Sequence, residues 1–433
     1  METDRADVKT TDTNAPPPGP GVSRRDVIEG LAGSVGAVLL AGVAGAHSAQ
    51  AATPSGQSAA ATVAGRRMGA PTSAVGTRSP FAARATRAPT GQEVGSSYTP
   101  LQHLSGTITP SDLHFERHHA GVPTIDPVSH RLVIHGMVDR PLTMTVDDIR
   151  RFPQVTRVHF VECSGNGRAV WRNPRADMTP QRTDGMTSNS EWTGVPVATL
   201  FREAGAQGAA SWFLAEGADA CQMTRSVPME KAFDDALVVW AQNGEPLRPE
   251  QGFPLRLLLP GFEGNANVKW LRRLELGTAP WMTRWETSKY TDPLKDGTAR
   301  IFSLAMDAKS IITSPSLPGR LEGSGWREVA GVAWSGRGRI TRVEVSTDGG
   351  VTWREASLQE PVLSKAHTRF SHMWNWSGEP AVLLSRATDE TGYVQPTRQQ
   401  LLDARGAGTD YHYNAIRGWQ VERDGGLSFF WET

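Results

Sequence analysis

The stretch VHFVECSGNGR, residues Val158–Arg168, decides how this sequence is interpreted. Its apolar, partly β-branched beginning predicts a strand that ends at Cys163. The Gly165-Asn166-Gly167 segment that follows tolerates positive φ and lets the backbone approach a ligand closely. Arg168 puts a positive charge beside the thiol, so we expect a lowered pKa for Cys163 and a thiolate able to bind metal or attack an electrophile. The alternative is a buried free cysteine at a strand end.

Length and composition indicate more than one domain. The chain has 433 residues, of which 38% are hydrophobic and 14 are Trp; this supports substantial cores. Basic and acidic residues number 45 each, so charge gives no reason to expect nucleic acid. The two cysteines are Cys163 and Cys221. They could form a disulfide in an exported protein, but not if Cys163 binds a metal. We expect Cys221 to be a buried thiol.

The N-terminal region differs in character from the rest. The motif Ser23-Arg24-Arg25-Asp26 precedes a weakly apolar, Gly- and Ala-rich run, and small residues at 49–51 offer a cleavage site. We interpret residues 1–51 as a twin-arginine signal region, which predicts export to the periplasm. The alternative, a membrane helix, is disfavoured because the run is interrupted and short, so we expect no stable membrane span. Residues 52–100, rich in Ala, Thr, Ser and Gly, are interpreted as a disordered linker.

Residues 101–290 alternate between strand and helix patterns. Strands are expected at 131–138, 158–163, 212–216, 236–240 and 251–261. A turn followed by a helix is expected at 141–152 and at 192–205, and residues 227–233 are expected to be helical or a turn. The segment Gln242-Asn243-Gly244-Glu245 predicts a hairpin turn. These patterns predict a mixed α/β domain over residues 101–290.

A cluster of ionisable residues, His114-Phe115-Glu116-Arg117-His118-His119, precedes these strands. Three interpretations remain open at this point: a solvated His-rich loop, a zinc site, or an anion site. The residues complete no recognised zinc spacing, whereas Arg and His together suit phosphate or sulfur oxyanions.

Two segments near the end of this domain suit an anionic cofactor. The expected strand at 251–261 carries one buried cation, Arg256, and the loop at 264–270 combines Gly and Asn with Lys269. Backbone N–H groups and a cation are then available together. Taken alone the signal is weak, because Gly- and Asn-rich loops are usually ordinary turns.

Residues 298–405 have the pattern of a β-sandwich. Segments 327–334 and 340–346 alternate with period two, Asp348-Gly349-Gly350 predicts a hairpin, and 381–389 predicts a further strand. This favours an immunoglobulin-like fold. Trp326, Trp334, Trp353, Trp374 and Trp376 are expected in its core or at an interface. Residues 406–433 are interpreted as a C-terminal tail, either an aromatic docking segment or a frayed terminus.

Taken in order, these motifs resemble the sulfite oxidase family of molybdenum enzymes over about residues 107–419, and within it the catalytic subunits that oxidise sulfane sulfur. The resemblance implies an α+β fold: a mixed α/β molybdopterin-binding domain followed by an immunoglobulin-like β-sandwich that forms the homodimer. It also implies two cofactor components, molybdenum and molybdopterin. Cys163 matches the metal ligand of the family. The cofactor contacts it implies are Phe115, Glu116, Arg117, His118, His119, Asp219, Gln251, Arg256, Asn267, Val268 and Lys269.

The catalytic residues that the resemblance implies are Arg117, Arg168 and Tyr290, the last of which follows Trp285 by five positions. The two arginines would neutralise a sulfur oxyanion, and Tyr290 would donate a hydrogen bond or tune the electron path. Two positions depart from the family pattern. Gln251 stands where sulfite oxidases often have His, and either Arg369 or His372 could stand at the position of the second substrate arginine.

The function implied is molybdenum-dependent oxidation of reduced sulfur, bound to a sulfur-carrier protein in thiosulfate oxidation. Electrons would pass to a c-type, dihaem cytochrome subunit, because this chain has no C-x-x-C-H sequence of its own. One alternative is a sulfite dehydrogenase that uses cytochrome c. An alternative from a different class is a non-catalytic exported binding module with an immunoglobulin-like domain.

Overall fold

The computed structural model describes residues 71–81, 85–407 and 411–432. The chain divides into one unit that ends at Thr77 and a second that begins at Arg78. All strands and helices of the described residues belong to the second unit. The predicted signal region, 1–51, lies outside the described residues. Among the helices that are described, none is both long enough and apolar enough to span a bilayer.

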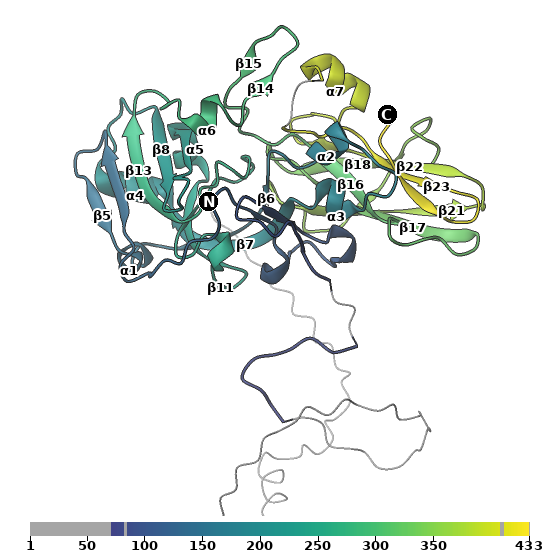
Figure 1. Cartoon of the computed structure of the whole chain (residues 1–433), viewed down its shortest axis with the longest axis horizontal. Coiled ribbons are helices and arrows are strands. Elements are labelled where there is room, and N and C mark those ends of the chain that lie inside the picture. The colour runs from purple at the N-terminus through teal and green to yellow at the C-terminus, as the bar shows by residue number, and fades with distance from the viewer. Residues whose placement is uncertain (1–70, 82–84, 408–410, 433) are drawn as a thin grey trace, which may run out of the picture. The chain divides into compact units, whose positions relative to one another are not determined.

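Two five-stranded sheets build the first domain (Figure 1). One has the order β5-β4-β13-β8-β9, in which only β4 and β13 are parallel. The other has the order β11-β10-β7-β6, with β12 paired to β10. The strands of the first sheet are β4 (Leu132–Gly136), β5 (Leu142–Met144), β8 (Trp212–Gly217), β9 (Thr224–Pro228) and β13 (Leu271–Gly277). Those of the second are β6 (Val155–Glu162), β7 (Thr187–Pro196), β10 (Leu237–Gln242), β11 (Glu245–Pro246) and β12 (Arg256–Leu258).

Short helices connect these strands. They are α1 (Val146–Arg150), α2 (Arg168–Arg172), α3 (Pro180–Asp184), α4 (Val197–Ala204), α5 (Met229–Asp234) and α6 (Arg284–Thr287), with 3₁₀ turns at Leu101–His103, Ser111–Leu113 and Pro249–Gln251. Helix α4 buries Leu200 and Phe201 in a core that also takes Phe213 from β8 and Val238 from β10. One apolar cluster therefore joins both sheets through an amphipathic helix.

Two predicted elements of this domain differ from the structure. Of the turn and helix expected at 192–205, the helix is present as Val197–Ala204, but the residues before it continue β7 to Pro196 and do not form a turn. The buried strand expected at 251–261 is reduced to Arg256–Leu258. Gly252 has φ 110°, and Pro254 has no N–H to donate to a ladder, so the chain cannot extend the strand toward its beginning.

The segment predicted as the end of a disordered linker is ordered from residue 85 onward. Strands β1 (Ala88–Pro89), β2 (Ser96–Tyr98) and β3 (Glu116–Arg117) form a three-stranded sheet. Ser97 and Thr99 are buried. Composition could not show this order, because the contacts that order the segment come from residues far along the chain. One example is the backbone hydrogen bond of Thr99 with Gly185.

The second domain is a β-sandwich, as predicted. A four-stranded sheet has the order β16-β17-β21-β20, and a five-stranded sheet has the order β19-β18-β22-β23-β24. The strands are β16 (Lys309–Ser314), β17 (Gly325–Trp334), β18 (Ile340–Ser346), β19 (Arg354–Glu355), β20 (Ser357–Leu358), β21 (Thr368–Trp376), β22 (Ala381–Asp389), β23 (Gly418–Val421) and β24 (Leu427–Phe430). A small ribbon, β14 (Asp292–Pro293) with β15 (Ala299–Arg300), precedes it, and α7 (Arg398–Arg405) lies within it in sequence.

The C-terminal residues form part of this sandwich. Strand β23 pairs with β22, and β24 pairs with β23, so the segment predicted as a tail supplies two strands of the five-stranded sheet. Trp334 and Trp376 are buried, as expected for core residues, but Trp326 is 64% exposed. Trp326 lies near the start of β17, where the side chains alternate between core and solvent.

Buried polar pairs join the two domains. Arg417 forms an ion pair with Asp184 of α3 in which both side chains are at most 2% exposed. Lys365 pairs with Asp235 at 2.5 Å. The His367 ring bonds Thr187 Oγ1 of β7 at 2.9 Å and packs against the rings of Phe160 and Trp334. The interface is therefore specific as well as apolar.

His367 predicts acid sensitivity of this interface. Burial lowers its pKa from 6.5 to about 3. Between about pH 3 and pH 6.5 this histidine is therefore protonated in the unfolded chain and neutral in the folded chain. This part of the stability is complete above pH 6.5 and falls by about 1.4 kcal/mol per unit as the pH drops. The free energy of unfolding, measured with urea between about pH 4.5 and 7.5, should change less steeply with pH in His367→Gln than in wild type. The exposed His103→Gln should keep the wild-type slope.

Candidate active site

The Cys163 loop has the form that the sequence predicts. Strand β6 ends at Glu162, and the Cys163 N–H donates to Met186 O at 3.0 Å. Gly167 adopts φ 89° and is the N-cap of α2, and an added Cβ there would lie 2.8 Å from Tyr413. The turn therefore requires glycine. Cys163 is 7% exposed, and neither cysteine is in a disulfide.

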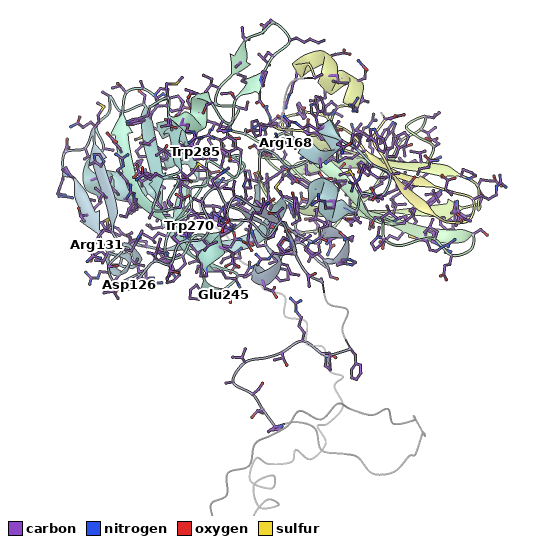
Figure 2. All side chains as sticks on the ribbon, viewed as in Figure 1. Asp126, Arg131, Arg168, Glu245, Trp270 and Trp285 are labelled. Atoms are coloured by element: carbon purple, nitrogen blue, oxygen red, sulfur yellow. The ribbon has the colours of Figure 1, made fainter. Side chains whose placement is uncertain are left out.

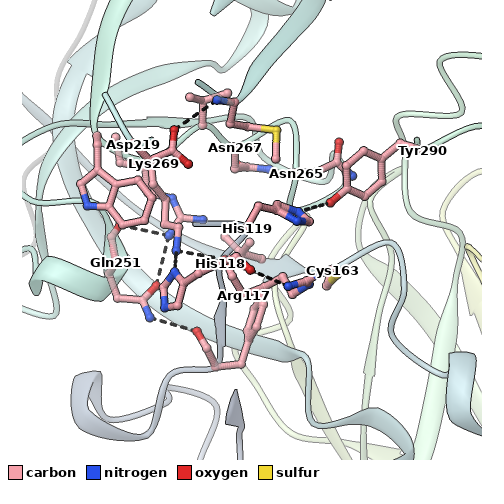
Figure 3. A pocket seen from close by; sticks show the side chains of 17 residues that line it. Arg117, His118, His119, Cys163, Asp219, Gln251, Asn265, Asn267, Lys269 and Tyr290 are labelled. Carbon is pink, nitrogen blue, oxygen red and sulfur yellow. Dashed lines mark hydrogen bonds between the residues drawn. The ribbon is translucent and has the colours of Figure 1, made fainter. Parts of the chain in front are cut away.

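Cys163 opens onto a cavity of about 620 Å³, including space open to solvent (Figure 3). Nearly all of the predicted cofactor contacts line this cavity together with the predicted catalytic Arg117 and Tyr290. The predicted residues in its wall are Phe115, Arg117, His118, His119, Cys163, Asp219, Gln251, Arg256, Asn267, Val268, Lys269 and Tyr290. Segments separated by more than a hundred residues in the sequence thus meet around one thiol.

Two predicted residues do not line the cavity. Glu116 bonds the Nε2 of His118 at 2.8 Å, and the Nδ1 of His118 lies 2.8 Å from Lys269 Nζ. Because the Lys269 ammonium can only donate, His118 Nδ1 accepts its hydrogen bond. The ring proton is therefore on Nε2, and this N–H donates a hydrogen bond to Glu116. Glu116 therefore reaches the cavity only through His118 and Lys269. Arg168 begins α2 (Figure 2) and lines a separate groove.

Two cations line the cavity, the buried Arg256 and the partly buried Lys269. The Arg256 Nε has no hydrogen-bond partner, and no carboxylate of the described residues pairs with this guanidinium. Burial lowers the pKa of Arg256 to about 9. Burial, and then the Arg256 charge, lower the pKa of Lys269 well below its usual value. An anion in the cavity would offset both the burial of these charges and their mutual repulsion, so these residues fit the phosphate of the expected pterin.

Other predicted contacts shape the wall of the cavity. Asn267 Oδ1 accepts the Leu259 N–H at 2.7 Å. Gln251 donates to Phe115 O at 2.9 Å, and its Oε1 accepts from Arg256 at 3.2 Å. Gln251 thus orients the arginine and ties it to the histidine-rich segment.

Asp219 accepts the Met223 N–H at 3.1 Å and the Cys221 thiol at 2.8 Å. Burial and this carboxylate raise the pKa of Cys221 to about 12. Cys221 is therefore a half-buried, protonated thiol. Asp219 orders the turn at residues 219–223 beside the cavity wall.

The expected lowering of the Cys163 pKa is wrong for the protein on its own. Burial raises the pKa of this thiol, and the opposing charge of Arg117 does not compensate. The sequence shows Arg168 beside the cysteine but does not show how deeply the thiol is buried. A soft metal ion would supply the missing positive charge and would bind the thiolate directly.

Aromatic side chains close the other end of the cavity. The Tyr290 hydroxyl and His119 Nε2 are 2.6 Å apart (Figure 3). Burial, and then Arg117, lower the pKa of His119 to about 3, so this imidazole is neutral. Trp285 stands 4.8 Å from the His119 ring, and Tyr411 stands 5.3 Å from the Tyr290 ring.

A wide groove of about 2420 Å³, including space open to solvent, meets the cavity at Arg117, His119, Cys163 and Tyr290. It is rich in cations, and most of them were not singled out in the sequence. They are Arg117, Arg168, Arg172, Arg182, Arg284 and Lys289. The density of arginine between 168 and 182 is the sequence signal for this groove. Arg369 donates to Gly106 O and Leu104 O, and neither it nor His372 lines the cavity or the groove.

Comparisons with known proteins agree with this geometry. The family described as oxidoreductase molybdopterin binding domain matches residues 119–285, and the Mo-co oxidoreductase dimerisation domain matches residues 300–418. The crystal structure of the sulfane dehydrogenase SoxCD from Paracoccus pantotrophus is 44% identical, with a TM-score of 0.78 over 81% of this chain and 93% of that chain.

Curated relatives are more distant. Mitochondrial sulfite oxidase of Mus musculus is 30% identical over 67% of this chain and 58% of its own length. The nitrate reductase [NAD(P)H] of Hordeum vulgare is 32% identical over 71% of this chain and 39% of its own length. The chain thus spans little more than half of the mouse protein and less of the barley one.

Proposed function

We propose, since the chain belongs to the sulfite oxidase family of molybdopterin oxidoreductases, that it oxidises reduced sulfur at a molybdenum centre held by Cys163. The observation that carries the proposal is the position of this thiol. It lines both a cation-lined cavity and the wider groove that adjoins this cavity. A cofactor in the cavity would therefore present its metal to a substrate that arrives through the groove.

The residues of the chain would bind and orient the reacting groups. Arg256 and Lys269 would hold the anionic pterin, and Cys163 would bind the metal through its sulfur. When bound, this group supplies oxygen-atom transfer to sulfur coupled to the removal of two electrons. Arg117, whose guanidinium is fixed by Gly95 O at 3.2 Å and by His118 O, would stabilise the negative charge of the sulfur oxyanion.

Tyr290 would act from the other side of the substrate. Its hydroxyl bonds the neutral His119 ring, and burial holds its pKa well above the usual value. It therefore keeps its proton at neutral pH and is available as a hydrogen-bond donor. Trp285 supports the His119 ring at 4.8 Å and would keep this pair in place.

The size and charge of the groove favour a sulfur group carried by a protein over a free inorganic ion. Small-molecule pockets typically have volumes of about 300–1,000 Å³, and the groove, with about 1100 Å³ of accessible space, lies at the top of that range. Its cations suit an anionic partner surface. We therefore propose sulfane sulfur on a sulfur-carrier protein as the substrate, a separate c-type cytochrome as the electron acceptor, a homodimer through the second domain, and export to the periplasm.

The test compares carrier-bound sulfur with free sulfite in the purified holoenzyme. Arg284→Glu, in the groove, should raise the KM for the carrier-bound substrate by roughly tenfold at low salt and change kcat little, because it weakens electrostatic attraction outside the reacting centre. The effect should shrink as salt rises. Arg354→Glu, on β19 outside the groove, is the matched control and should behave as wild type. Rapid turnover of free sulfite together with a silent Arg284→Glu variant would favour the sulfite dehydrogenase alternative.

A further inference from the structure

A fully buried carboxylate stands immediately before the metal-ligand position. Glu162 is 0% exposed and accepts three hydrogen bonds. Lys309 Nζ lies 2.5 Å from Oε1, Trp334 Nε1 lies 2.7 Å from Oε2, and Asn166 Nδ2 lies 2.9 Å from Oε1. Lys309 and Trp334 come from β16 and β17 of the second domain. The second domain therefore holds a side chain one residue away from Cys163.

The same carboxylate organises the turn that contains the thiol. Asn166, one of its donors, accepts the Met186 N–H at 3.1 Å, and Met186 O accepts the Cys163 N–H at 3.0 Å. Glu162 O accepts the Gly264 N–H at 2.6 Å. An added Cβ at Gly264 would lie 2.9 Å from that oxygen, so glycine permits the approach. The turn after the thiol is thus tied to the Glu162 carboxylate, and the residue before the thiol is tied to Gly264 through the main chain.

The C-terminal segment holds the following residue. The His412 N–H donates to Ser164 O at 2.8 Å, and the Asn265 amide donates to Ser164 Oγ at 3.1 Å. The residues on both sides of Cys163 are therefore fixed by contacts from several segments, including the second domain and the C-terminal residues. The contact through Glu162 involves charge and is fully desolvated, so it restricts the geometry most.

We propose that Lys309 and Trp334 are positioning residues of the active site, which set the direction of the Cys163 side chain through Glu162. A carboxylate with three fixed donors has one orientation, and that orientation fixes the turn from 162 to 166. The second domain then completes the metal-binding loop, in addition to any role in dimer formation. This inference rests on the proposed role of Cys163 as the metal ligand.

The experiment uses the full chain with Cys221→Ser, so that Cys163 is the only thiol. In cofactor-free protein, Lys309→Met should let iodoacetamide label Cys163 about tenfold faster, the scale on which residues that orient metal ligands act. Loss of a positive charge does not raise the thiolate fraction, so faster labelling reports a freer side chain. In the holoenzyme the same variant should change the Mo(V) electron paramagnetic resonance spectrum.

Arg417→Met is the matched control. It removes an equally buried ion pair that joins the same two domains, with both side chains at most 2% exposed, but it does not contact Glu162. It should lower the melting temperature and leave the labelling rate and the spectrum as in wild type. Equal labelling rates in Lys309→Met and Arg417→Met would overturn the proposal, because both effects would then be general loosening.

A second variant separates positioning from stability. Lys309→Met combined with Glu162→Gln removes the buried unpaired charge and should recover most of the melting temperature. It should still label rapidly, because the third donor is missing and an amide cannot accept from all the remaining partners. Labelling at the wild-type rate would overturn the proposal even if Lys309→Met alone fails to fold. Since labelling needs no metal, its outcome is independent of whether Cys163 proves to be the ligand.

Discussion

Cys163→Ser is expected to abolish the oxidation of reduced sulfur. A serine hydroxyl is a hard donor that stays protonated near neutral pH, whereas the sulfur-coordinated metal expected here requires a soft thiolate. Loss of residues that only orient a metal ligand typically costs roughly 10- to 100-fold in activity, so loss of the ligand should cost more. The measurements are turnover, molybdenum content and the Mo(V) spectrum of the purified variant.

Cys221→Ser is the control for this substitution. Its thiol donates to Asp219 at 2.8 Å, a bond that serine can also make, so activity and metal content should stay close to wild type. A Cys163→Ser protein that retains molybdenum with an unchanged spectrum and full turnover would remove Cys163 from the mechanism.

Arg256→Met should have opposite effects on stability and on cofactor content. The guanidinium is buried and has no carboxylate partner among the described residues, so an apolar side chain of similar length should leave the cofactor-free protein as stable as wild type or more so. Molybdopterin binding should weaken. A hydrogen bond to a charged group contributes about 1.5–3 kcal/mol, which corresponds to roughly 10- to 150-fold in affinity.

Arg225→Met is the matched comparison. Arg225 is equally buried but forms a 3.0 Å ion pair with Glu263. Its loss would strand a buried carboxylate and destabilise the fold by about 3–5 kcal/mol. Melting temperature of the cofactor-free proteins and pterin content after purification distinguish the two variants. If Arg256→Met were as destabilising as Arg225→Met and bound cofactor normally, the cavity would not be the anion site that we infer.

The sequence predicted the cavity well because its residues belong to short motifs at the ends of strands. Cys163 follows β6 directly, Arg256 begins β12, and Lys269 lies just before β13. Glycine and proline near these positions restrict the backbone locally, so residue type and spacing carry most of the information.

Features that depend on distant contacts were not predicted. The pair of Glu162 with Lys309 joins residues 147 positions apart, and no local pattern indicates that either is buried. The cations Arg284 and Lys289 meet Arg172 and Arg182 only in the folded groove. The sign of the Cys163 pKa shift was wrong for the same reason, because desolvation depends on packing around the whole site.

The pairing of β23 and β24 with β22 has a consequence for the order in which the protein is assembled. The residues that complete the sheet, and with them His412 and Arg417, follow Cys163, Arg256 and Lys269 in the sequence and leave the ribosome after them. A nascent chain that already contains Cys163, Arg256 and Lys269 therefore still lacks the contacts of His412 with Ser164 and of Arg417 with Asp184. The loop that contains Cys163 reaches its final form only after residues 412–430 have been made, so the cofactor meets a finished site no earlier than that.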